Sequence, residues 1–148
     1  MSGLFLDSNV LVEGICSDWG LSKAILSLCA VRIHQMILAE DVKDEVERSL
    51  LMIVYSGRRA ERVLTDYDRF IALARPQIVP SPGEEEIFSA RHLIRHQNDV
   101  PILVAALNSS PDWVITNNRE HFTRQVAMRT GLQIASPFEF FQIVHSSA

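Results

Sequence analysis

The chain contains very little cysteine, and the few that it has imply no disulfide framework. Only Cys16 and Cys29 occur among 148 residues. Both lie in apolar stretches with helical spacing, without a Cys-x-x-Cys pair, so we interpret them as small core residues in a reducing compartment. Hydrophobic residues make up 47% of the chain. A single domain of this length, residues 1–148, can bury most of its apolar surface without covalent crosslinks.

Long hydrophobic runs and positive net charge are also missing. No apolar stretch approaches the roughly 18 residues that a membrane span needs, and the opening residues lack the basic segment of a secretory signal. We therefore expect a cytoplasmic protein that has no membrane segment. The net charge of −4 excludes an overall basic field that would attract nucleic acid. Arginine nevertheless outnumbers lysine twelve to two, which suits planar contacts with carboxylate or phosphate groups.

Short apolar runs alternate with stretches of helical spacing along the whole chain. This alternation predicts an α/β fold of three layers, α/β/α, with a parallel central sheet covered on both faces. The predicted strands are Leu4–Leu6, Val31–His34, Trp113–Ile115 and Leu132–Ala135, with an extended segment at Ile78–Gly83. The predicted helices begin after Asp7 or Ser8, cover Leu21–Ala30, Leu38–Ile53, Arg58–Ala74, a turn from Glu84, Val100–Leu107 and Glu120–Arg129, and end with one from Pro137.

Polar residues follow two of the short apolar runs. Asp7 ends the first run, and Thr116 and Asn118 follow Trp113–Ile115. Ligands of open α/β sheets sit outside the carboxyl ends of the strands, so these side chains are expected to meet there. Between them in sequence lie Glu45, in a helical stretch, and Asp99, at the start of another. A cluster of oxygen ligands of this kind is what Mg²⁺ or Mn²⁺ requires.

Each of the three acids also has a purely structural interpretation. Asp7 and Asp99 are both suited to cap the helices that follow them. Glu45 borders the apolar face of its helix, whereas Asp44 and Glu47 point away from it. That apolar face is formed by Val42, Val46, Leu50 and Ile53. Glu45 is thus the acid on this helix best placed to enter a cleft, the alternative being a solvated glutamate on the flank of the helix.

Taken together, the ordered set resembles the PIN-domain family of metal-dependent ribonucleases. Many bacterial and archaeal members of that family are toxins of toxin–antitoxin modules. The similarity spans nearly the whole chain. The segments that carry it are Phe5–Leu11, Asp44–Leu50, Asn98–Leu107, Trp113–Phe122 and Gln133–Phe141.

The resemblance implies a set of metal ligands. Asp7, Glu45 and Asp99 would hold one or two Mg²⁺ or Mn²⁺ ions, and Thr116 would join the site through its hydroxyl. Asn118 stands where many family members carry a fourth aspartate. An amide oxygen can ligate a hard cation but brings no negative charge, so a second metal would bind more weakly. Glu120, two positions further on, is a candidate to compensate.

The resemblance also implies an activity and partners. The expected protein is an endoribonuclease that hydrolyses RNA, with a cognate antitoxin protein as its partner. The alternative is a non-catalytic PIN-like module that binds RNA or a protein. The apolar run Leu51–Tyr55 exceeds what a small sheet needs, which indicates a homodimer. Arg119 and Arg124 are either phosphate contacts or solvated surface residues.

Two patterns point to other chemistry. His92 and His96 are spaced to share a helix face as zinc ligands would, but no catalytic glutamate lies between them, and a surface or partly buried pair is the commoner case. Asp7 also resembles the nucleophile of haloacid-dehalogenase-like phosphatases. Those enzymes need a second aspartate two residues later as general acid, and Asn9 cannot take that role.

Overall fold

Five parallel strands form the centre of the molecule in a computed structural model that describes residues 1–57 and 60–146. The strands are β1 (Gly3–Leu6), β2 (Gln35–Ala39), β3 (Gln77–Val79), β4 (Trp113–Ile115) and β5 (Ile134–Ala135). Their order across the sheet is β3-β2-β1-β4-β5, and every neighbouring pair runs parallel. The carboxyl ends of all five strands therefore meet at one edge of the sheet.

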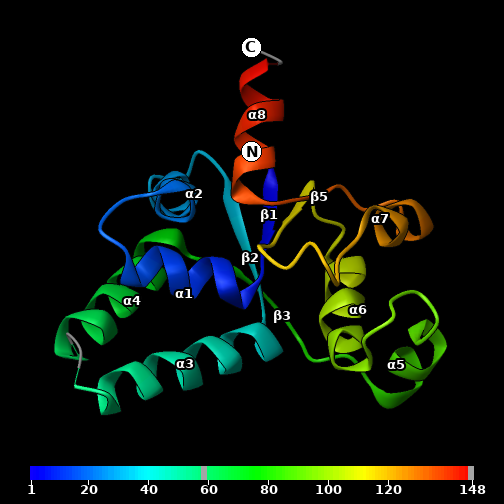
Figure 1. Ribbon diagram of the computed structural model, residues 1–148, viewed down its shortest axis with the longest axis horizontal. Helices are drawn as coiled ribbons and strands as arrows, with labels where there is room; N and C mark the ends of the chain where they lie inside the picture. The colour runs from blue at the N-terminus through cyan, green and yellow to red at the C-terminus, as the bar shows by residue number, and fades with distance from the viewer. Residues whose placement is uncertain (58–59, 147–148) are drawn as a thin grey trace.

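Helices cover both faces of this sheet. Figure 1 shows α1 to α4 on one side and α5 to α7 on the other, with α8 running away from the sheet to the C-terminus. The helices are α1 (Ser8–Cys16), α2 (Leu21–Ala30), α3 (Glu40–Tyr55), α4 (Ala60–Ala74), α5 (Glu84–Ala90), α6 (Val100–Ser109), α7 (Arg124–Thr130) and α8 (Pro137–Ser146), and a 3₁₀ turn, η1, covers Gln97–Asp99. The three-layer α/β/α architecture is thus confirmed. No helix within the described part of the chain is long and apolar enough to cross a membrane.

The central strand and one helix are buried almost completely, as their sequences predict. All three apolar residues of β1, Leu4 to Leu6, are inaccessible to solvent, which is typical of a parallel strand with both faces covered. In α6, Val100, Leu103 and Ala105 are also fully buried. These two elements carry Asp7 and Asp99 at their ends, so the tightest packing of the molecule fixes the positions of both acids.

The predicted strand at Val31–His34 is wrong. Val31 and Ile33 are exposed, and Arg32 adopts a left-handed turn with φ of 63° directly after α2. The strand is instead β2, where four consecutive residues from Met36 are buried. Helix α3 accordingly begins at Glu40 rather than at residue 38. A short apolar run that precedes a helical pattern cannot be divided into strand and helix by periodicity alone.

Two other helix starts differ from prediction or cannot be compared. The helix expected from Glu120 begins only at Arg124, because the Thr123 side chain caps it by accepting a hydrogen bond from the Val126 amide at 3.2 Å. The start expected at Arg58 lies outside the described residues, and α4 is described from Ala60.

The two cysteines occupy the positions expected of small core residues. Both are free thiols, Cys29 being fully buried and Cys16 half-buried. Burial raises the pKa of the Cys29 thiol to about 12, so this side chain stays protonated and unreactive at neutral pH.

Candidate functional site

Asp7 and Thr116 lie side by side where strands β1 and β4 end. The register pairs Leu6 with Ile115, so the next residue of each strand emerges at the same point of the edge. The Thr116 hydroxyl donates to Oδ2 of Asp7 at 2.7 Å, and the Ser8 amide donates to Oδ1 at 2.8 Å. Asp7 is only 7% exposed and Thr116 is fully buried. Asp7 thus caps α1, as one interpretation predicts, and also faces the strand end.

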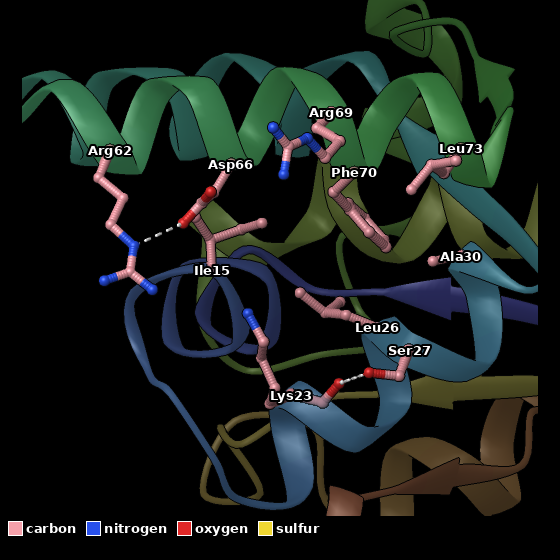
Figure 2. A pocket seen from close by; sticks show the side chains of 10 residues that line it. All are labelled: Ile15, Lys23, Leu26, Ser27, Ala30, Arg62, Asp66, Arg69, Phe70 and Leu73. Atoms are coloured by element: carbon pink, nitrogen blue, oxygen red, sulfur yellow. Dashed lines mark hydrogen bonds and ion pairs between the residues drawn. The ribbon is translucent and has the colours of Figure 1, made fainter.

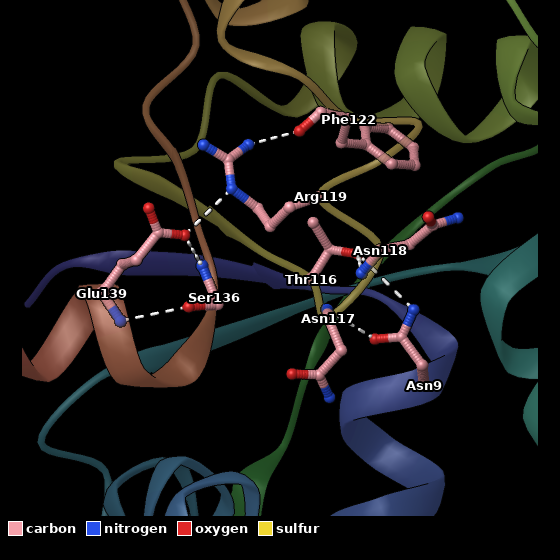
Figure 3. Close-up of polar contacts among 8 residues, drawn as sticks. All are labelled: Asn9, Thr116, Asn117, Asn118, Arg119, Phe122, Ser136 and Glu139. Atoms are coloured by element: carbon pink, nitrogen blue, oxygen red, sulfur yellow. Dashed lines mark hydrogen bonds and ion pairs between the residues drawn. The ribbon is translucent and has the colours of Figure 1, made fainter.

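Asn9 holds this pair together, a role that the sequence did not suggest. Its Nδ2 donates to Oδ2 of Asp7 at 3.1 Å and lies 3.5 Å from the Thr116 hydroxyl. Its Oδ1 accepts from the backbone N–H of Asn117 at 2.9 Å, as Figure 3 shows. The only available signal was the spacing, because a residue two positions after a strand-end acid lies in the first turn of the helix that follows.

Burial and a neighbouring charge both act on Asp7. Burial raises the pKa of its carboxyl above the usual value of 3.8, and hydrogen bonds from Thr116, Ser8 and Asn9 offset part of that rise. The charge of Asp99 raises the pKa as well, and its effect is the smallest of these. Two carboxylates therefore repel each other at this edge of the sheet, and a cation between them would relieve the repulsion.

Asp99 does not use its side chain to cap a helix, although it stands at the N-cap position of α6. Its Oδ2 lies 2.7 Å from Nδ1 of His121, and the side chain is only 19% exposed. The ring of His121 stacks on that of His96, with centroids 3.5 Å apart and an angle of 17° between the planes. No pattern in the sequence indicates a role for His121, because the contact joins two segments that are separate in sequence.

His92 and His96 do not share a helix face. Helix α5 ends at Ala90, and the chain turns before it reaches the η1 segment that His96 precedes. Both histidines are exposed, and the ring of His96 stacks on that of His121. The spacing that suggested zinc ligands therefore has no helical basis, because i and i+4 residues adjoin only within a helix.

Glu45 is placed apart from the pair of aspartates. It is exposed on α3 and lines a cleft of about 390 Å³ together with Arg48 and Asn98. Asn98 and Pro101, on either side of Asp99 in sequence, also line this cleft, whereas Asp7 and Asp99 are not among its lining residues. Within residues 1–57 and 60–146, no group of three or more His, Cys, Asp or Glu side chains lies close enough to hold a metal ion. The structure thus brings Asp7 and Thr116 into contact, places Asp99 near enough for its charge to act on Asp7, and leaves Glu45 in a neighbouring cleft.

Asn118 is held at the site through its backbone. Its N–H donates to the Thr116 hydroxyl at 3.0 Å, and its carbonyl accepts from the N–H of Phe122 at 3.0 Å. The side chain is partly buried, whereas that of Glu120 is exposed. These two hydrogen bonds fix the backbone from which the Asn118 side chain extends, next to the Thr116 hydroxyl that contacts Asp7.

Arg119 anchors the same loop to helix α8. Its Nε donates to Oε1 of Glu139 at 2.9 Å, and its guanidinium also donates to the carbonyl of Phe122 (Figure 3). The same Glu139 oxygen accepts from the N–H of Ser136 at 2.9 Å. Arg119 is therefore committed to internal contacts and is not available for phosphate in this arrangement. Arg124 is exposed.

A second hollow lies between α1, α2 and α4. Figure 2 shows side chains of α4, among them Arg62 and Arg69, facing Lys23 and Leu26 of α2 across a groove of about 290 Å³. Arg62 forms an ion pair with Asp66, one turn further along α4, at 3.6 Å. None of the five predicted site residues lines this groove.

A parallel α/β/α domain with one acid after its central strand and a second acid at the start of α6 is thus the class that fold and site define. A family model described as the PIN domain matches residues 4–120, and the chain therefore belongs to the PIN domain family. The nuclease family implied by the sequence motifs is thereby confirmed. No curated protein sequence matches the chain.

Several solved structures share the fold at low sequence identity. VapBC2 from Rickettsia felis, bound to a DNA fragment from their promoter, has a TM-score of 0.60 and 17% identity, over 90% of this chain and 98% of that one. PAE2754 from Pyrobaculum aerophilum has a TM-score of 0.64 and 12% identity, over 98% and 90%. FitAcB from Neisseria gonorrhoeae has a TM-score of 0.62 and 15% identity, over 91% and 98%. At these identities, the likeness concerns the fold.

Proposed function

We propose that the chain, as one domain over residues 1–148, is a metal-dependent endoribonuclease. The observation that carries this proposal is the buried carboxylate of Asp7 beside Asp99 at the ends of β1 and η1. Burying a carboxylate near a second negative charge is costly unless a cation compensates it.

The donor set fits Mg²⁺ or Mn²⁺. Carboxylate, hydroxyl and amide oxygens are ligands that hard cations prefer, and the paired acids are the strongest donors among them. Asp7 and Asp99 would hold the ion, Asn118 would add a neutral oxygen, and Glu45 would act from the adjoining cleft. When bound, such an ion lowers the pKa of a water molecule and neutralises charge on the phosphate.

The other side chains orient these ligands. Thr116 and Asn9 together fix Oδ2 of Asp7, which limits the directions in which the remaining lone pairs can point. Oriented ligands lose less entropy when they bind an ion, so these hydrogen bonds favour metal binding. In the absence of a bound metal ion, the two aspartates would repel RNA, because its phosphates carry the same charge.

Cleavage of single-stranded RNA by the purified protein, measured across Mn²⁺ concentrations, tests the proposal. Wild type should cleave only with metal, and Asp99→Asn should abolish cleavage because it removes a ligand charge. Asp68→Asn, which alters an exposed carboxylate on α4, is the matched control and should leave cleavage unchanged. Wild type without metal-dependent cleavage would instead favour the non-catalytic PIN-like module that binds RNA or protein.

We further propose that the protein is the toxin of a toxin–antitoxin module in the cytoplasm. Support comes from the PIN family and from structural neighbours that are VapBC complexes. The cheapest test is the neighbouring reading frame, which should encode a small DNA-binding domain with a disordered tail. The product of that frame should bind the purified chain and suppress RNA cleavage. A neighbouring frame of another kind would argue against the toxin role.

A homodimer is our proposal for the assembly. On α3, Leu51, Met52 and Tyr55 are exposed, with 70% of Met52 and 84% of Tyr55 accessible to solvent. Exposed apolar residues in such a group are typical of an interface. Light scattering at tens of micromolar should show a dimer, and Met52→Lys should shift it towards monomer. A wild-type monomer at that concentration would contradict the proposal.

A further inference from the structure

The contact between His121 and Asp99 has a defined direction. An ionised carboxylate can only accept hydrogen bonds, so the proton of this 2.7 Å contact belongs to Nδ1 of the histidine. Hydrogen bonding in the described part of the chain involves Oδ2 of Asp99 and not Oδ1. One oxygen of the carboxylate is thus engaged by the protein, and the other is left for a ligand.

The histidine is itself held in position from two sides. Its ring stacks on His96, which comes from the segment just before Asp99, at a centroid distance of 3.5 Å. Its backbone lies inside the turn that Phe122 N–H closes on the Asn118 carbonyl. The ring therefore cannot rotate freely, and its Nδ1 proton is presented to Asp99 in a fixed direction.

Helix capping does not set the direction of the Asp99 carboxylate. The residue stands at the N-cap of α6, where an aspartate side chain ordinarily accepts a hydrogen bond from an N–H of the first turn. Its backbone is helical, with φ of −90° and ψ of −10°, whereas a capping residue ordinarily has an extended backbone. The structure shows no capping bond from Asp99 and shows the histidine contact instead.

We propose that His121 is a positioning residue that fixes the direction of the Asp99 carboxylate, so that its free oxygen faces the metal. The inference rests on the proposed function, because it assumes that Asp99 is a ligand. Outer groups that orient metal ligands typically change metal affinity by about 10- to 100-fold when they are removed. His121→Phe, which keeps an aromatic ring for stacking and lacks the donor, should weaken Mn²⁺ binding by that factor.

The experiment is calorimetric titration of Mn²⁺ into each purified variant at one fixed pH. His121→Asn is the rescue variant, because its amide N–H can replace Nδ1 as donor, and it should retain most of the affinity. His92→Phe makes the same change at an exposed histidine and should bind like wild type. In an Asp99→Asn background, His121→Phe should cause no further loss, since the two residues act through one contact.

Two readouts on metal-free protein separate positioning from folding. His121→Phe should melt close to wild type in the presence of a chelator, because the lost contact is partly exposed and contributes little to the free energy of unfolding. Proton NMR of metal-free wild type should show a downfield, exchange-protected imidazole N–H that Asp99→Asn removes. Absence of that signal from wild type would overturn the proposal.

The outcomes distinguish this inference from the proposed function. If His121→Phe binds Mn²⁺ as wild type does while Asp99→Asn does not, the positioning role is overturned and the metal site stands. If His121→Asn loses as much affinity as His121→Phe, the donor is irrelevant, and the role is again overturned. If wild type binds no Mn²⁺, both the proposed function and the inference fail.

Discussion

Replacing Thr116 by valine tests whether one buried hydroxyl organises the strand-end site. The two side chains have nearly the same shape, and Thr116 is fully buried, so the change creates almost no cavity. It does remove the hydroxyl, which donates to Asp7 at 2.7 Å and accepts from the N–H of Asn118 at 3.0 Å. The weaker approach of Asn9 at 3.5 Å is lost as well.

The expected cost follows from these contacts. A hydrogen bond to a charged group contributes about 1.5–3 kcal/mol, and a buried N–H left without a partner costs about 1–3 kcal/mol. The Asn118 N–H is only partly buried, which places its share near the lower end. Loss of the Thr116 hydrogen bond also lets the pKa of Asp7 rise further, so protonation limits the penalty. We expect the free energy of unfolding to fall by about 3 kcal/mol.

Urea denaturation at neutral pH with a chelator measures this quantity, and Thr116→Ser is the matched control. Serine keeps the hydroxyl and loses one buried methyl group, which costs about 1 kcal/mol. The valine variant should therefore be clearly less stable than the serine variant. If both lose the same free energy, the hydroxyl contributes nothing measurable and the network of Asp7 and Asn118 is held by other contacts.

Three further predictions concern charge. Burial and a neighbouring carboxylate raise the pKa of Asp7 in the folded state. Between pH 3.8 and the raised pKa, the metal-free folded state therefore binds more protons than the unfolded state, and the free energy of unfolding falls as pH rises. Asp7→Asn should reduce this pH dependence, measured as the change of the urea midpoint with pH. Asn118→Asp should tighten Mn²⁺ binding in calorimetry more than Asn117→Asp, which adds the same charge one residue away. Arg119→Met should lower stability by at most about 1 kcal/mol, because the ion pair with Glu139 is partly exposed, and the double change with Glu139→Gln should cost little more.

Most of the fold was predictable because parallel strands and buried helices leave simple patterns. The apolar run of β1 and the near-continuous apolar sequence of α6 both report burial on every side. The strand predicted at residues 31–34 is wrong because the apolar residues of α2, the following turn and β2 adjoin in sequence. Val31 and Ile33 alternate as strand residues do, yet they lie in an exposed turn, and the real strand merges in sequence with the helix that follows. Tertiary packing decides between such segments.

The site was predictable only where topology alone brings residues together. Asp7 and Thr116 end neighbouring parallel strands, so their contact follows from the sheet order. Asp99 and His121 are 22 residues apart and meet through a helix start and a loop, a contact that no periodicity encodes. Arg119 was predicted to contact phosphate or to be solvated, and it contacts Glu139 instead. This partner belongs to α8, whose position against the loop depends on the whole fold.

The loop between β4 and α7 concentrates the interactions that order the site. Within a few residues it supplies a hydroxyl to Asp7, a backbone anchor at Asn118 and the imidazole that contacts Asp99. Irregular backbone of this kind has few internal hydrogen bonds, so its conformation must be stabilised from outside. Arg119 provides that link through α8, although the region that matches the PIN family ends at residue 120. The geometry of the acids thus depends on a helix beyond the part of the chain in which the family is recognised.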